Sequence, residues 1–73
     1  MERYRNKGGD SGVSTFEIGS DSISVQFNGT TKTYKYSYSG KAGRNHVDIM
    51  KSLARNGSGL NRYIDQYVKY KYD

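Results

Sequence analysis

The sequence predicts an α+β domain in which a three-stranded antiparallel meander is covered on one face by two C-terminal helices. Three observations support this prediction: apolar and polar residues alternate from 13 to 38, Asn28-Gly29 separates two alternating runs, and helical spacing begins after residue 43. Alternation places every second side chain on one face of a strand, whereas helical spacing gathers apolar residues into a stripe. Burying one sheet face together with two stripes gives a two-layer domain.

The first twelve residues are expected to lie outside this domain. They contain Arg3, Arg5 and Lys7, then Gly-Gly-Asp-Ser-Gly over 8–12, and almost nothing apolar that could offset the entropy of ordering. We predict a flexible, basic, Gly-rich tail over 1–12 and a single domain over 13–73. A terminus that only aids solubility is preferred to a nucleic-acid-binding arm.

The first two strands are expected at Val13 to Ile18 and Ser22 to Phe27. The residues between them, Gly-Ser-Asp, favour a turn. Asn28-Gly29 then predicts a hairpin, because both residues tolerate the positive φ that a tight turn requires.

The third strand is expected from Thr31 to Tyr38. Tyr34, Tyr36 and Tyr38 occupy alternate positions and therefore share one face, with Lys35 on the other. The rings are interpreted as core beneath the helices in preference to a platform for stacked bases, and Tyr38 is the one expected to escape burial.

Two helices are expected after the glycine-rich break at 39–43. The first ends at Asn56-Gly57, since glycine readily adopts the left-handed C-terminal conformation, and Ser58 is expected to cap the second. Residues 68–72 also alternate, so they are either a helical tail or a short terminal strand. The expected core is Phe16, Ile18, Ile23, Val25, Phe27, Tyr34, Tyr36, Val47, Met50, Leu53, Leu60, Ile64 and Tyr67.

Composition limits the possible functions. The 73 residues have a formal net charge of +5 and contain 8 Tyr and 2 Phe but no Cys, which excludes disulfides and thiolate metal sites. The single histidine, His46, is expected to be a packed or rim residue, and no carboxylate pair or phosphate-binding glycine loop is recognisable, so neither catalysis nor a cofactor is expected. No apolar run is long enough for a membrane span, and a cytoplasmic location is expected.

Four features over about Val13 to Tyr70 resemble the KTSC domain, a module named after the C-terminus of some lysyl-tRNA synthetases. They are Val25-Gln26-Phe27-Asn28-Gly29, Tyr34-Lys35-Tyr36, a helix over 46–54 followed by Asn-Gly-Ser-Gly, and Leu60-Asn61-Arg62-Tyr63-Ile64. Many members have Val-Pro after the tyrosine strand, whereas this chain has no proline. The resemblance implies a non-catalytic domain with a suggested association with RNA.

Two functions are therefore expected as alternatives. The first is binding of RNA or another polyanion through positive charge and exposed tyrosine edges. The candidate residues are Lys35, Tyr38, Arg44, Lys51, Arg55, Arg62 and Lys69. An ordinary solvated face is the preferred interpretation of the helical cations, because Asp48 and Asp65 can pair with them locally. The second function is interaction with a protein partner or a second copy through a sheet edge or the Tyr-rich C-terminus.

Overall fold

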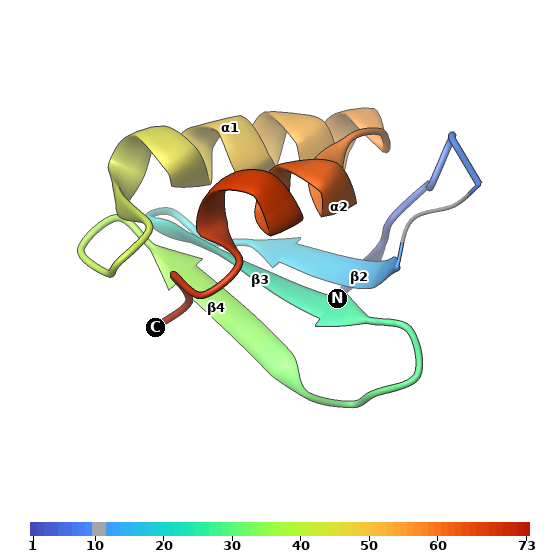
Figure 1. Cartoon of the computed structure of the whole chain (residues 1–73), viewed down its shortest axis with the longest axis horizontal. Coiled ribbons are helices and arrows are strands. Elements are labelled where there is room, and N and C mark those ends of the chain that lie inside the picture. Colours follow the sequence, from blue (N-terminus) through green and yellow to red (C-terminus); the bar gives the residue numbers. More distant parts are fainter. Residues whose placement is uncertain (10–11) are drawn as a thin grey trace.

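The strands form one antiparallel sheet in which each strand pairs with the next one along the chain. The computed structural model describes residues 1–9 and 12–73. The sheet is followed by helices that cover one of its faces, so the predicted α+β architecture is confirmed (Figure 1). The strands are β1 (Glu2–Arg3), β2 (Val13–Ile18), β3 (Ser22–Phe27) and β4 (Thr33–Ser37), and the helices are α1 (Gly43–Asn56), α2 (Leu60–Tyr63) and the π-helical η1 (Ile64–Val68).

The sheet has a fourth strand because part of the expected tail joins it. Glu2 and Arg3 pair with Phe16 and Thr15, and Tyr4 is only 4% exposed. The expectation that residues 1–12 lie outside the domain therefore does not hold for residues 2–4, while positions 10 and 11 lie outside the described residues. One buried aromatic ring removes about 150–250 Å² from water, which favours ordering of a short segment without leaving any periodic pattern in the sequence.

The other three strands align their apolar residues in rows on the covered face. Ile23 lies between Ile18 and Tyr36, and Val25 lies between Phe16 and Tyr34. The hairpin between β3 and β4 contains the predicted Asn28-Gly29 pair, with Gly29 at a φ of 81°. Strand β4 is shorter than the predicted 31–38 because its pairing with β3 ends at Thr33 and Ser37.

The junction between the helices differs from the prediction in its cap. Gly57 ends α1 with a φ of 75°, and its N–H donates to the carbonyls of Leu53 at 2.9 Å and Ala54 at 3.2 Å. Ser58 does not cap α2, because Gly59 occupies the N-cap position and no side-chain cap bond forms there. Instead the N–H of Leu60 donates to the phenol oxygen of Tyr4 at 3.2 Å. A side chain 56 positions away thus satisfies a helix amide that sequence reasoning assigned to the adjacent serine.

Most of the residues expected in the core are buried. Ile18, Phe27, Tyr34 and Leu53 are half-buried against it, whereas Tyr67 is 48% exposed. The wider π turn of η1 places Tyr67 on the outer flank beside Tyr63, away from the buried line of α2 and η1. The buried apolar residues are Tyr4, Val13, Phe16, Ile23, Val25, Tyr36, Ala42, Val47, Met50, Ala54, Leu60, Ile64 and Val68.

The chain end is neither the helical tail nor the strand that the sequence left open. After η1, the Tyr72 ring packs edge-on against Tyr34 at 4.9 Å and Tyr36 at 6.4 Å. The N–H of Asp73 donates to the carbonyl of Lys35 at 2.7 Å, so the chain end lies along the outer edge of β4. No helix in residues 1–9 and 12–73 has the length and apolar character needed to cross a bilayer.

Candidate nucleic-acid interface

The N-terminal segment is fixed against the end of α1. The Tyr4 ring packs edge-on against Phe16 with 6.5 Å between centroids, and its backbone N–H donates to the carbonyl of Ser14 at 3.0 Å. Three residues later, the N–H of Lys7 donates to the carbonyl of Gly57 at 2.8 Å. The basic segment therefore has a defined position on the surface.

Glycine at position 57 permits this close approach. A Cβ at Gly57 would lie 2.6 Å from the Cβ of Arg5, a distance that real side chains do not adopt. The residue also has a φ of 75°, which disfavours any side chain. The same glycine thus ends α1 and leaves space for the Arg5 side chain of the basic segment.

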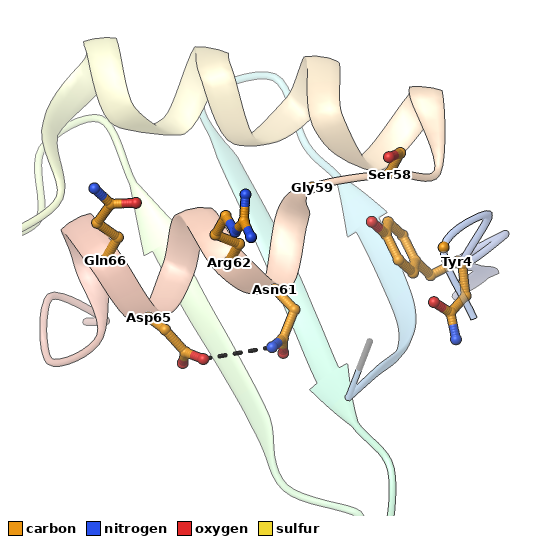
Figure 2. A pocket seen from close by; sticks show the side chains of 9 residues that line it. Tyr4, Ser58, Gly59, Asn61, Arg62, Asp65 and Gln66 are labelled. Atoms are coloured by element: carbon orange, nitrogen blue, oxygen red, sulfur yellow. Dashed lines mark hydrogen bonds between the residues drawn. The ribbon is translucent and has the colours of Figure 1, made fainter. Parts of the chain in front are cut away.

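A hollow of about 530 Å³ lies between this segment and α2 (Figure 2). Its size is within the range typical of small-molecule and cofactor sites, about 300–1,000 Å³. Figure 2 shows Tyr4 on the side of the N-terminal segment and Asn61, Arg62, Asp65 and Gln66 projecting from the opposite helix. The lining residues are Tyr4, Asn6, Gly8, Ser58, Gly59, Asn61, Arg62, Asp65 and Gln66.

Arg62 lines this hollow, and four more exposed cations lie on the N-terminal segment and in the last turn of α1. Two carboxylates lie near these cations in the chain, Glu2 in β1 and Asp65 in η1. In the described part of the chain, the ion pair found is Arg44–Asp48 at 3.8 Å, on another part of α1. We name this group the cationic end. It consists of Arg3, Arg5, Lys7, Arg55 and Arg62.

A second hollow, of about 240 Å³, lies beside the cationic end and is mainly aromatic. Asp65 lines both hollows, so the two adjoin at this residue. Tyr70 is 74% exposed at the second hollow, with the Lys69 ammonium 5.6 Å from its ring centroid. We name this the aromatic hollow; its lining is Phe27, Tyr34, Tyr36, Ile64, Asp65, Lys69, Tyr70 and Tyr72.

The floor of the aromatic hollow is well packed. Phe27 meets the Tyr34 ring edge-on at 5.6 Å, and Lys32 lies over the same ring at 5.1 Å. Burial, then the phenols of Tyr34 and Tyr72 and the carboxylate of Asp65, raise the pKa of Tyr36 to about 12. Tyr36 therefore remains neutral and internal, while Tyr34 keeps part of its surface open.

The candidate residues from the sequence do not form one surface. Arg62 lines the larger hollow, Lys69 lines the aromatic hollow, and Arg55 is exposed in the last turn of α1. Lys35 lies opposite Ser24 on the uncovered face of the sheet, which also carries Thr15, hydrogen-bonded to Gln26 at 3.2 Å.

Tyr38, Arg44 and Lys51 form a separate cluster on the other end of α1. Lys51 was expected on the solvated face but is only 8% exposed. Its ammonium donates to the Tyr38 hydroxyl at 3.1 Å and to the Ser20 carbonyl at 3.3 Å, because its long stem can lie over the tyrosine ring. Tyr38 in turn donates to Asp48, and Arg44 lies 5.0 Å from its ring centroid. Lys51 is therefore held internally, whereas Arg44 is exposed and pairs with Asp48 at the surface.

His46 is half-buried and joins the two helices. Its Nδ1 lies 2.6 Å from the hydroxyl of Tyr63, and its ring stacks with Tyr67 at 6.1 Å. Burial raises the pKa of Tyr63, and the adjacent Tyr67 phenol contributes to the shift. Ile49 is 45% exposed and lies three residues after His46 on the same side of α1, so we name His46, Ile49, Tyr63 and Tyr67 the outer helical patch.

Sequence reasoning missed Arg3, Arg5 and Lys7 as site residues, although their charge was visible. The signal that could have placed them is Tyr4, a lone aromatic residue between arginines. In combination, the fold and the site define a small α+β domain with a cationic end that adjoins an aromatic hollow. No family model, curated protein or solved structure matches the chain, and the resemblance to the KTSC domain stays a prediction.

Proposed function

We propose that the protein is a non-catalytic module that binds single-stranded nucleic acid, RNA in particular, across the cationic end and the aromatic hollow. The observation that carries the proposal is the fixed position of the N-terminal segment, which adds Arg3, Arg5 and Lys7 to Arg55 and Arg62. Lysines and arginines that neutralise phosphates supply most of the sequence-independent affinity for nucleic acids.

The aromatic hollow supports single strands in preference to duplexes. Bases of a single strand can leave the stack and lie against aromatic side chains, whereas paired bases cannot. Tyr70 and Tyr34 offer partly open rings within the same hollow, and Lys69 and Lys32 lie beside them. One single-stranded ligand could therefore use both surfaces, with its phosphates at the cationic end and its bases in the aromatic hollow.

Fluorescence anisotropy with a labelled RNA dodecamer at two salt concentrations tests this function. If four of the five cations contact phosphates, the affinity should fall about 50-fold between roughly 50 and 200 mM salt. Arg62→Gln and Arg5→Gln should each weaken binding and reduce the salt dependence by about one phosphate contact. Lys35→Gln and Arg44→Gln remove the same charge elsewhere and should change affinity by less than about twofold.

Two results would contradict the proposal. One is the lack of measurable binding at the lower salt concentration. The other is an equal loss of affinity in the Lys35→Gln control, which would assign binding to overall charge and not to the cationic end. A duplex of the same sequence should bind more weakly, because its bases cannot reach the aromatic hollow.

A second candidate function is association with a second copy of the chain through the outer helical patch. Ile49 and Tyr67 are both about half exposed there, and large apolar side chains grouped on a surface often mark interfaces. Association through a sheet edge has less support. The N–H of Asp73 already donates to the Lys35 carbonyl at the β4 edge, and β1, at the other edge, has only 2 residues. Light scattering over a range of concentrations decides: a dimer that Ile49→Lys dissociates supports this candidate, and a monomer throughout excludes it.

A further inference from the structure

Asp65 occupies an unexpected position for a surface that binds phosphates. It lines both the hollow of about 530 Å³ and the aromatic hollow, and its side chain is exposed. Its Oδ2 receives a long hydrogen bond of 3.4 Å from the Asn61 amide. An ionised carboxylate accepts hydrogen bonds and donates none, so it repels a phosphate instead of binding it. A ligand that spans both hollows therefore meets Asp65 most favourably with a group that donates a hydrogen bond.

The Watson–Crick edges of the four bases differ in what they can offer to a carboxylate. Guanine presents two adjacent N–H donors, on N1 and the exocyclic N2, which match the two oxygens of one carboxylate. Adenine and cytosine present one exocyclic amine beside a ring nitrogen acceptor. Uracil presents one N–H between two carbonyl oxygens. In those three bases an acceptor faces the second carboxylate oxygen, so guanine alone binds in a bidentate manner.

We propose that Asp65 selects guanine in a single strand whose phosphates lie along the cationic end and whose neighbouring base lies in the aromatic hollow. This inference rests on the proposed nucleic-acid function. A donor suited to guanine O6 lies beside Asp65 on the Asn61 amide, which projects from the same side of the helix (Figure 2). The exposed ring of Tyr70 is placed to stack with the base that follows or precedes the guanine.

The test compares labelled octamers that differ at one base. A uridine octamer with one central guanosine should bind about tenfold more tightly than the same octamer with adenosine, cytidine or uridine there, at the lower end of what a bidentate contact gives. Inosine lacks the exocyclic amine and should lose most of this preference. Asp65→Asn should reduce the preference to within about twofold while leaving the affinity for the uridine octamer equal or higher, because a negative charge is removed.

Glu17→Gln is the matched control, since it removes an exposed carboxylate at a distance from both hollows. It should retain the full guanine preference. Equal binding of all four octamers overturns the guanine inference and leaves the proposed function intact. A preference that persists in Asp65→Asn also overturns it, since another group would then read the base. If no octamer binds, the proposed function and this inference fail together.

Discussion

Replacing Tyr4 with alanine should destabilise the whole domain, although Tyr4 lies in a segment with the composition of a disordered tail. Its side chain is 4% exposed, packs against Phe16 and accepts a hydrogen bond from the N–H of Leu60. Truncating a buried aromatic residue to alanine costs about 3–5 kcal/mol. Since a 73-residue domain has a total stability of roughly 4–11 kcal/mol, the variant should lose a large part of it.

The more conservative Tyr4→Phe separates packing from capping. The ring remains, so the expected loss is only about 1–3 kcal/mol, from the buried Leu60 N–H that is left without a partner. Tyr70→Ala is the matched control for alanine truncation. That ring is 74% exposed, so its removal should change the free energy of unfolding by no more than about 0.5 kcal/mol.

Urea unfolding followed by circular dichroism measures these differences as shifts in the transition midpoint. Tyr4→Ala should also weaken RNA binding beyond the loss of stability, because Arg3, Arg5 and Lys7 would lose their fixed position. A loss of less than about 1 kcal/mol for Tyr4→Ala would show that the N-terminal segment is not part of the cooperative fold. The cationic end would then lose its structural basis.

Two further predictions concern stability. Gly57→Ala should lower the free energy of unfolding by at least about 1–2 kcal/mol from the left-handed backbone alone, and by more from the clash with Arg5. Gly29→Ala has the same backbone cost but no atom near its Cβ, so it should lose the backbone contribution only. Thermal melts of both variants compare them. Tyr36 ionises near pH 10 in the unfolded chain but only at about pH 12 in the folded protein. Its contribution to the free energy of unfolding is therefore fully present below pH 10 and is lost as the pH rises to 12. The loss should be about 3 kcal/mol in urea titrations, and Tyr36→Phe should remove most of it.

Local patterns were sufficient for much of the fold. The bounds of β2 and β3, the Asn28-Gly29 hairpin and the end of α1 at Gly57 follow from side-chain alternation and glycine conformation, which depend on near neighbours in the chain. The covered face of the sheet was equally predictable, because Ile23 and Val25 alternate with polar residues.

The errors arose where a long-range contact replaced a local rule. Ser58 has the residue type of an N-cap, but the phenol of Tyr4 accepts the first helical N–H instead. Lys51 has the spacing of a solvated cation, but Tyr38 and Ser20 lie close enough to hold its ammonium. Tyr67 follows an α-helical stripe that the π turn displaces.

The sequence by itself determined the layers of this protein, because periodicity decides which face of each element is apolar, and it supplied the positive charge. Tertiary structure alone decided where that charge collects. The position of Arg3, Arg5 and Lys7 depends on one tyrosine entering a core built from residues far along the chain, and on a glycine that leaves space for the segment beside α1. A single buried ring leaves no periodic pattern in the sequence. Its effect can be seen only in the folded structure, where Tyr4 contacts both Phe16 and Leu60.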